Sequence, residues 1–331
     1  MTSLLDRTYV DLWTKPEPRL PQLKKWLLGE VWTIERFKEC GAAPAEYLKT
    51  GEKMVNEKES LLTAAADSYF RELVTAQAPA RTIVEFWDTY PNSCVVILDG
   101  CSLRELPRLL ELAQSSRRPV VECTCGRSAI PSSTEHFISD RLGLALPALG
   151  PSELGSRHEL KNHGIRYYFF QKPNEFQHIS EDSGSILLWH RFPDLRFMDS
   201  TASSAEMYDG IWDNLGMVWK NTVQALPTKR SMLVTSDHGY VFFGAGLSDT
   251  NLQQMDGPLQ GKRFRQFSDK EYFPEEGTLG LFLDHSRRMA VLQGRCRNRP
   301  QAPSPSKSLY RHGGLSLMEV LTPWLVIGPM E

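Results

Sequence analysis

Two short apolar runs, each closely followed by an aspartate, most constrain what this chain can fold into. The first is Cys94–Leu98, which ends in Asp99-Gly. The second is 232–234, which runs into Thr-Ser-Asp237-His238-Gly. Uninterrupted apolar runs of this length are typical of strands covered on both faces, whereas strands with one face in water alternate apolar and polar residues. We therefore expect buried strands that end in polar loops.

Further candidate strands alternate with helices along most of the chain. Apolar runs predict strands at 119–123, 165–170, 186–189 and 325–327, and a hairpin or pair of late strands at 279–283 and 289–292. Apolar residues at helical spacing predict helices over 103–112 and 206–224. This alternation predicts an α/β fold with a mostly parallel central sheet flanked by helices.

The first part of the chain has a different pattern. Helical spacing of apolar residues recurs over 20–37, 53–73 and 81–90, and no convincing strand interrupts it. We interpret residues 1–90 as a helical N-terminal extension or cap, and residues 91–331 as the domain that contains the sheet.

The composition excludes several classes of protein. A net charge of -2 over 331 residues gives no overall basic excess of the kind that nucleic-acid binding would favour. No apolar run approaches the roughly 18 residues of a membrane span, and the N-terminus lacks a signal-peptide pattern. The six cysteines show no disulfide-scaffold spacing. We expect a cytoplasmic protein with reduced thiols and no membrane partner.

Residues that can bind metal ions or act as nucleophiles recur where predicted elements end. They are Asp99, the loop 131–134 with Thr134, Asp194, the pair Asp237 and His238, and His312. A strand-end aspartate is common and a lone histidine is usually structural, so each alone is equally well explained as a polar turn or a helix cap. In open α/β sheets, however, the carboxyl ends of strands meet at one edge, where ligands bind. Carboxylates and imidazoles together suit zinc, or manganese where oxygen ligands predominate.

The order of these residues resembles a known family. The succession Asp-Gly, Pro-Ser-x-Thr, His-x-x-x-Asp, Ser-Asp-His-Gly and His-Gly-Gly-x-Ser is similar to the PglZ domain of the alkaline phosphatase superfamily. The resemblance runs from about Thr82 to Ile327. Its specific parts are Thr-Ser-Asp-His-Gly-Tyr and His-Gly-Gly-Leu-Ser-x-x-Glu. It implies an alkaline phosphatase-like fold with a two-metal hydrolase site.

The resemblance also implies a role for each residue. Asp99, Asp237 and His238 match the ligands of one metal, and Thr134 matches the nucleophile that also touches it. Asp194 and His312 match ligands of the second metal. The implied cofactor is Zn²⁺ at two sites, with Mn²⁺ or Mg²⁺ as alternatives.

The second metal site departs from the superfamily pattern. Many members carry it as Asp-x-x-x-His, but Met198 stands four residues after Asp194. Asp199 is an alternative ligand, and His190 is a further one for which we favour a structural role. We expect this second site to be the weaker of the two.

Other residues near these motifs remain candidates for the site. Ser102, Ser132 and Ser133 are alternative nucleophiles, although serines before a helix also serve as caps. Lys262, Arg263 and Arg265 are possible substrate phosphate contacts, because cations and an aromatic lie together there. The alternative is that these three are solvated loop residues.

The leading hypothesis is a metal-dependent phosphoester hydrolase. We expect a phosphodiesterase acting on nucleotides or oligonucleotides through a threonine nucleophile, ahead of a phosphomonoesterase. The resemblance further implies bacterial phage defence, with protein partners from a phage-resistance system. The alternative hypothesis is a catalytically weak or inactive scaffold or regulatory partner of such a complex.

Overall fold

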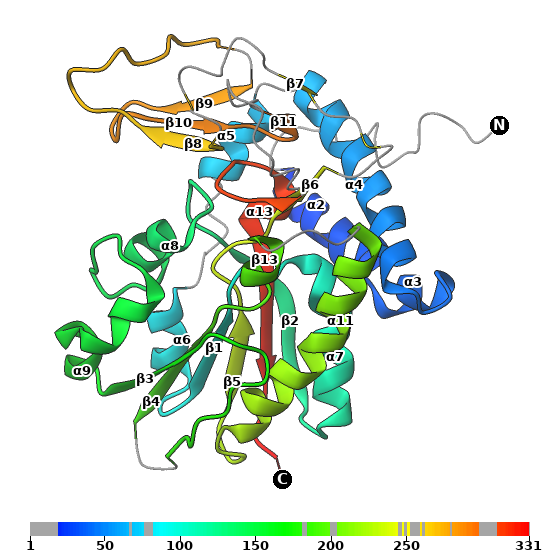
Figure 1. Ribbon diagram of the computed structural model, residues 1–331, viewed down its shortest axis with the longest axis vertical. Helices are drawn as coiled ribbons and strands as arrows, with labels where there is room; N and C mark the ends of the chain where they lie inside the picture. Colours follow the sequence, from blue (N-terminus) through cyan, green and yellow to red (C-terminus); the bar gives the residue numbers. More distant parts are fainter. Residues whose placement is uncertain are drawn as a thin grey trace.

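A six-stranded sheet lies at the centre of the protein (Figure 1). The computed structural model describes residues 19–65, 68–75, 82–180, 184–198, 204–243, 247, 250–251, 259, 262–278, 280–297 and 310–330. The strand order is β2-β13-β5-β1-β4-β3. The strands are β1 (Cys94–Leu98), β2 (Val120–Arg127), β3 (Ile165–Phe170), β4 (Ser185–His190), β5 (Met232–Thr235) and β13 (Leu321–Ile327).

The sheet is mostly parallel, as the sequence predicts. β1 runs parallel to β4 and β5, and β3 runs parallel to β4. β13 is antiparallel to both of its neighbours, β2 and β5, so the other five strands share one direction. The polar loops that follow β1, β4 and β5 therefore lie at the same edge of the sheet.

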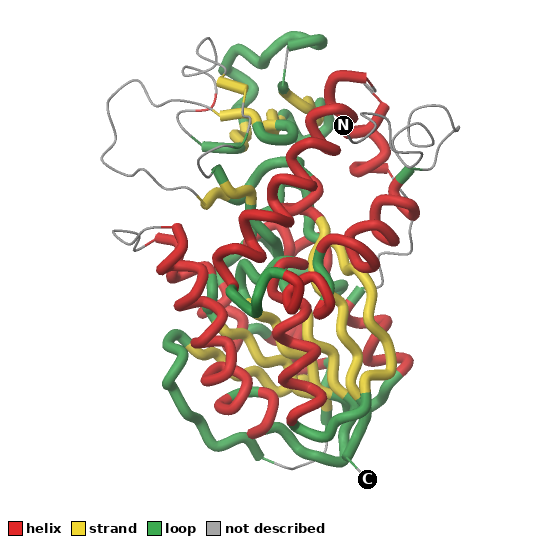
Figure 2. Tube along the Cα trace, turned by 90° about the vertical axis from the view of Figure 1, so that its right-hand side faces the viewer, coloured by secondary structure: helices red, strands yellow, loops and turns green. Residues whose placement is uncertain are grey.

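Helices cover both faces of this sheet (Figure 2). Cys94, Val96 and Leu98 of β1 face one apolar core, and Val95 and Ile97 face the other. The first core includes α7 and α11, and the second includes α6, α8 and α9. The helices are α6 (Ile83–Thr89), α7 (Leu106–Ser115), α8 (Thr134–Arg141), α9 (His158–Asn162), α10 (Asp194–Met198), α11 (Ser204–Asn221) and α13 (Leu317–Val320), with 3₁₀ segments at η2 (Leu103–Glu105), η3 (Pro151–Ser156) and η4 (Val223–Ala225).

The N-terminal segment is helical, but its helices begin and end at other residues than the apolar spacing suggests. It forms α2 (Leu20–Trp26), a π-helical turn η1 (Leu27–Val31), α3 (Ile34–Glu39), α4 (Pro44–Ala65) and α5 (Ser68–Thr75). The helix expected over 20–37 is broken because Thr33 is extended and caps a new helix, accepting a hydrogen bond from the Arg36 amide at 3.0 Å. Apolar side chains of these helices share a core with one face of the sheet. The domain division near residue 90 stays a prediction.

A small antiparallel sheet forms a second layer of strands, above the central sheet in Figure 1. The late strand pair predicted from sequence forms β9 (Leu281–Asp284) and β10 (Met289–Leu292), and β8 (Phe264–Gln266) pairs with β10. Two short pairings lie nearby: β6 (Val241–Phe242) with β12 (Tyr310–Arg311), and β7 (Thr250–Asn251) with β11 (Cys296–Arg297). The first of these brings residue 312 close to the loop after β5.

The cysteines and the helices bear on two expectations drawn from composition. All six cysteines are free thiols, and four of them are buried. Within the described ranges, no helix has both the length and the apolar character needed to span a bilayer.

Candidate metal centre

Six side chains selected from the sequence meet at the carboxyl edge of the parallel strands. They are Asp99 after β1, Thr134 at the start of α8, Asp194 at the start of α10, Asp237 and His238 after β5, and His312 after β12. Five separate segments of the chain therefore supply one constellation.

The first group consists of Asp99, Asp237 and His238, all of them buried. His238 Nε2 lies 3.6 Å from Asp99 Oδ1 and 3.5 Å from Asp237 Oδ2. The Thr134 hydroxyl donates to Asp237 Oδ2 at 2.6 Å and lies 3.4 Å from His238 Nε2. The threonine is thus in contact with the potential ligands.

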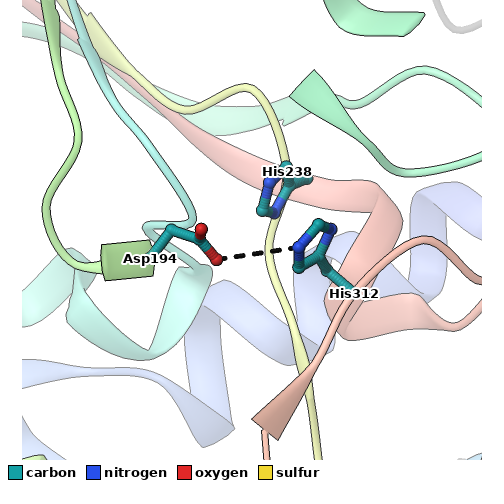
Figure 3. Close-up of side chains that lie close together, drawn as sticks. All are labelled: Asp194, His238 and His312. Atoms are coloured by element: carbon teal, nitrogen blue, oxygen red, sulfur yellow. Dashed lines mark ion pairs between the residues drawn. The ribbon is translucent and has the colours of Figure 1, made fainter. Parts of the chain in front are cut away.

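The second group consists of Asp194, His238 and His312 (Figure 3). His312 Nε2 lies 3.7 Å from Asp194 Oδ1. The rings of His238 and His312 are stacked, with centroids 4.0 Å apart and planes at 10°. His238 is therefore common to both groups, and the two potential sites adjoin.

Hydrogen bonds fix the tautomers of both histidines. The Nδ1 of His238 lies 2.9 Å from the Gly239 carbonyl oxygen, and the Nδ1 of His312 lies 3.2 Å from the Ser132 carbonyl oxygen. Because a carbonyl oxygen only accepts, each Nδ1 must carry the proton. In the neutral form of each ring, Nε2 then keeps its lone pair and faces carboxylates, which is the arrangement that metal-binding histidines adopt.

The electrostatics of the first group also fit a cation. Oδ2 of Asp99 accepts a hydrogen bond from the Trp189 indole at 3.3 Å, but Oδ1 is buried and has no hydrogen-bond partner in the described chain. Burial, and then repulsion by Asp237 and Asp194, raise the pKa of Asp99 well above its ordinary value. A divalent cation would offset this concentration of carboxylates. The set of carboxylate oxygens and imidazole nitrogens suits zinc, and also manganese.

The two imidazoles differ in their environment. Burial opposes the charged form of His238, but Asp237 and Asp194 outweigh it, so its pKa lies above the usual value. Burial and the neighbouring His238 lower the pKa of His312. Of the two rings, His312 is the one more readily kept neutral for metal binding.

The alternative nucleophiles bond elsewhere. Ser102 donates to Glu105 at 2.7 Å, and the Ser133 hydroxyl lies 2.8 Å from His136 Nδ1. Ser132 donates to the Gly314 carbonyl at 2.9 Å. Thr134 is thus the one of the four candidate hydroxyls that contacts Asp237 and His238.

The structure tests only one of the two alternative ligands for the second metal site, His190 and Asp199. His190 stacks on Phe170, and its Nδ1 accepts a hydrogen bond from the Phe192 amide at 3.0 Å. Burial lowers the pKa of His190 to about 4. It belongs to neither group of potential ligands, so the structure favours its structural role. Asp199 lies outside the described residues.

The three basic residues predicted as phosphate contacts differ in burial and in their ion-pair partners. Arg263 is buried and ion-paired with Glu319 at 2.7 Å. Arg265 pairs with Glu271. Lys262 is exposed. Two of the three therefore already have carboxylate partners within the protein.

Sequence reasoning did not single out Arg191 for the site. The pairing of β1 with β4 ends at Leu98 and His190, so Arg191 follows beside Asp99. Its positive charge favours the ionised form of Asp99, and its guanidinium has no hydrogen bond or ion pair with any described residue. The sequence feature that could have identified Arg191 is its position two residues after the predicted strand 186–189.

These observations define an α/β protein with a candidate metal centre at the carboxyl edge of a mostly parallel sheet. No family model and no curated protein matches the sequence. Among solved structures, murine ectonucleotide pyrophosphatase/phosphodiesterase 5 resembles it with a TM-score of 0.46 and 14% identity over 72% of this chain and 88% of that chain. Phosphonoacetate hydrolase from Sinorhizobium meliloti gives a TM-score of 0.42 and 11% identity over 72% and 91%. Identities this low carry no information on activity.

Proposed function

We propose that this protein is a metal-dependent phosphoester hydrolase with Thr134 as its nucleophile. The observation that carries the proposal is the position of the Thr134 hydroxyl, 2.6 Å from Asp237 Oδ2 and 3.4 Å from His238 Nε2. A hydroxyl becomes a usable nucleophile when a neighbouring base or a bound cation stabilises its deprotonated form.

The start of α8 supports binding of a phosphoryl group. Thr134 is the first residue of this helix, and Ser133 is its N-cap. The Ser133 side chain does not cap the helix, because its hydroxyl bonds to His136. Amides of the first turn are therefore not occupied by that cap, and a helix N-terminus favours a phosphoryl oxygen.

The residues present are consistent with a two-step displacement. Asp237 accepts the hydrogen bond of the Thr134 hydroxyl and so orients its oxygen. The threonine hydroxyl gives its proton to Asp237 and its oxygen forms a bond to phosphorus. The bond to the leaving oxygen breaks, and the released alcohol takes up a proton. Water then cleaves the threonine phosphoester and restores Thr134. Divalent cations, when bound, would stabilise charge on the attacking and leaving oxygens.

The proposed ligand sets follow the two groups. Asp99, Asp237 and His238 would hold one ion, and Asp194 with His312 would hold the other, with Zn²⁺ as the preferred ion and Mn²⁺ or Mg²⁺ as alternatives. The exposed Lys262 remains a proposed phosphate contact, and we add Arg191, which follows β4 at the register position of Asp99.

The substrate class and biological setting are finer parts of the proposal. We infer a phosphodiesterase that acts on nucleotides or oligonucleotides, in the bacterial phage defence that the PglZ resemblance implies. The alternative is a scaffold or regulatory role. It is less well supported, because a binding function gives no reason for the threonine hydroxyl to contact Asp237 and His238.

Hydrolysis of bis-p-nitrophenyl phosphate by the zinc- or manganese-loaded protein tests the proposal. Thr134→Ala and Asp237→Ala should each lower the rate at least about 1,000-fold, because the first removes the attacking oxygen and the second its orienting base. Ser139→Ala is the matched control, since this hydroxyl lies on α8 and bonds to Asp140. The covalent intermediate, a p-nitrophenyl phosphodiester of Thr134, should be detectable by mass spectrometry after acid quenching. No activity, or a rate indifferent to Thr134→Ala, would contradict the proposal.

A further inference from the structure

A buried ion pair adjoins the loop that carries His312. Arg263 donates from Nε to Glu319 Oε1 at 2.7 Å and from Nη2 to Oε2 at 2.9 Å. Nη1 donates to the Cys296 carbonyl at 2.7 Å, and Nη2 also donates to the Gly294 carbonyl at 2.8 Å. Arg263 is 6% exposed and Glu319 is fully buried. The guanidinium is thus held by internal acceptors, which is a different role from the phosphate contact expected from sequence.

The same carboxylate holds the loop that carries His312. Oε1 of Glu319 accepts a hydrogen bond from the Gly314 amide at 2.9 Å, and Oε2 accepts one from the Ser316 hydroxyl at 2.7 Å. Each oxygen therefore receives one bond from Arg263 and one from the loop. Charge-assisted bonds of this kind are stronger than neutral ones and fix the geometry at both ends.

The two glycines after His312 allow the loop to approach the arginine closely. A Cβ at Gly314 would lie 2.4 Å from Arg263 Nη2. Gly313 has φ +99, and a Cβ there would lie 2.9 Å from a ring carbon of Phe264. The backbone of this loop therefore packs on Arg263 and Phe264, which only glycine permits.

Ser132 anchors the other side of the loop. Its hydroxyl accepts from the Gly313 amide at 2.9 Å, and its carbonyl oxygen accepts from His312 Nδ1 at 3.2 Å. His312 is therefore fixed between Ser132 on one side and the Arg263–Glu319 pair on the other. The side chain of Glu319 supports the His312 loop, whereas its backbone carbonyl accepts a bond from the Gly239 amide at 3.0 Å beside His238.

We propose that Glu319 and Arg263 are positioning residues that determine whether the Asp194–His312 site retains its metal ion. The proposal rests on the proposed function, because it concerns the second ion of the same centre. Outer residues that orient a ligand commonly change metal affinity 10–100-fold when altered. Because side-chain changes at Glu319 leave its carbonyl bond to Gly239 in place, they should weaken the second site and spare the first.

Metal stoichiometry measured on the full chain tests this assignment. After dialysis against zinc and removal of free metal, elemental analysis of the wild type should give two equivalents per chain. Glu319→Gln should retain one tight equivalent and bind the second at least about 10-fold more weakly in a chelator competition. Gly314→Ala disturbs the contact between the loop and Arg263 from the loop side, because the added Cβ would clash with the guanidinium. It should weaken binding of the second equivalent in the same way.

A control separates positioning from general destabilisation. Glu72→Gln alters another buried carboxylate, which accepts from the Leu20 amide at 2.5 Å and pairs with Arg19 at 3.8 Å, far in sequence from both histidine loops. It should keep two equivalents with unchanged affinity. Two tight equivalents in both Glu319→Gln and Gly314→Ala would overturn the inference and leave the hydrolase proposal intact. If Glu319→Gln does not fold, the metal stoichiometry of Gly314→Ala alone decides whether the inference holds. Fewer than two equivalents in the wild type would overturn the inference together with the two-metal site.

Discussion

At the scale of the residue, Asp99 lies in an environment that disfavours its charged form. Its Oδ1 is buried and lacks a hydrogen-bond partner among the described residues, and two further carboxylates repel it. A buried polar group left in this state costs on the order of 1–3 kcal/mol. The metal-free protein therefore carries a local strain that a bound cation would relieve.

The variant Asp99→Asn should separate these two contributions. We expect it to raise Tm of the metal-free protein by a few degrees, because one buried negative charge is removed while the bond from Trp189 is kept. Zinc should raise Tm of the wild type, and the same change should abolish that rise. Thermal unfolding with and without zinc measures both effects. A lower Tm in the metal-free state would show that the ionised carboxylate stabilises the fold.

Arg191 offers a second test at this scale. Its backbone follows the register position beside Asp99, and its positive charge favours the ionised form of that carboxylate, so we expect it to bind an anionic group of a substrate. Arg191→Ala should raise KM for a phosphoester about 10-fold, the value of one lost charge-assisted hydrogen bond, with a smaller effect on kcat. Arg36→Ala, which removes a surface partner of Glu39, is the control and should leave KM unchanged. An unaltered KM in Arg191→Ala would exclude the contact.

At the scale of the element, helix α4 is connected to the loop after β5 by a buried charge network. Glu52 of α4 accepts from Arg104 Nε at 2.6 Å and from Arg295 Nη1 at 3.1 Å. Arg104 in turn donates to the Tyr240 carbonyl at 2.8 Å, and Arg295 donates to the Phe242 carbonyl. Both arginines therefore fix the backbone just beyond His238 and depend on one glutamate.

Loss of that glutamate should be costly. Glu52→Ala leaves two buried arginines without their carboxylate, and we expect roughly 3–5 kcal/mol of lost stability in urea unfolding. Glu46→Ala on the same helix removes an exposed pair with Lys49 and should cost less than about 1 kcal/mol. Equal effects of the two changes would show that the buried network contributes nothing specific.

The sequence predicted the sheet better than it predicted the helices or the supporting contacts. Uninterrupted apolar runs identify buried strands, because both faces of such a strand must be covered. The reversed direction of β13 leaves no such mark in its residues. The six residues of the centre were found because they follow predicted elements in a recognisable order. Glu52 was missed because its partners Arg104 and Arg295 lie 52 and 243 residues away, which no local pattern reveals. Glu319, however, stands three residues after Ser316, a capping-box spacing that was available from sequence.

At the scale of the whole molecule, the N-terminal helices are part of the main apolar core. Leu27, Val31 and Val55 are fully buried in the same cluster as Val96 and Leu98 of β1. α4 also supplies Glu59, which accepts from the Leu317 amide at 2.7 Å. The N-terminal helices therefore pack against the central sheet and also contact the segment after His312.

A chain that begins at residue 91 should therefore not fold. Deleting the N-terminal helices would expose one side of the apolar core, and it would leave Arg104 and Arg295 without Glu52. We expect loss of a cooperative unfolding transition, with aggregation in size-exclusion chromatography. Co-expression of residues 1–90 as a separate chain is the control and should recover some folded complex. A monomeric shortened chain with a sharp transition would show that the predicted boundary near residue 90 separates independent units.

The location of β13 between β2 and β5 has a consequence for biosynthesis. Residues 321–327 pair with strands made some 90 and 190 residues earlier, and they occupy an interior place in the sheet. While the ribosome is still translating the intervening chain, β2 and β5 each lack this neighbour, and their unpaired edges are open to other chains. The aspartates are also synthesised long before His312. The central sheet and the candidate metal centre are therefore completed only when the last segments of the chain have been synthesised.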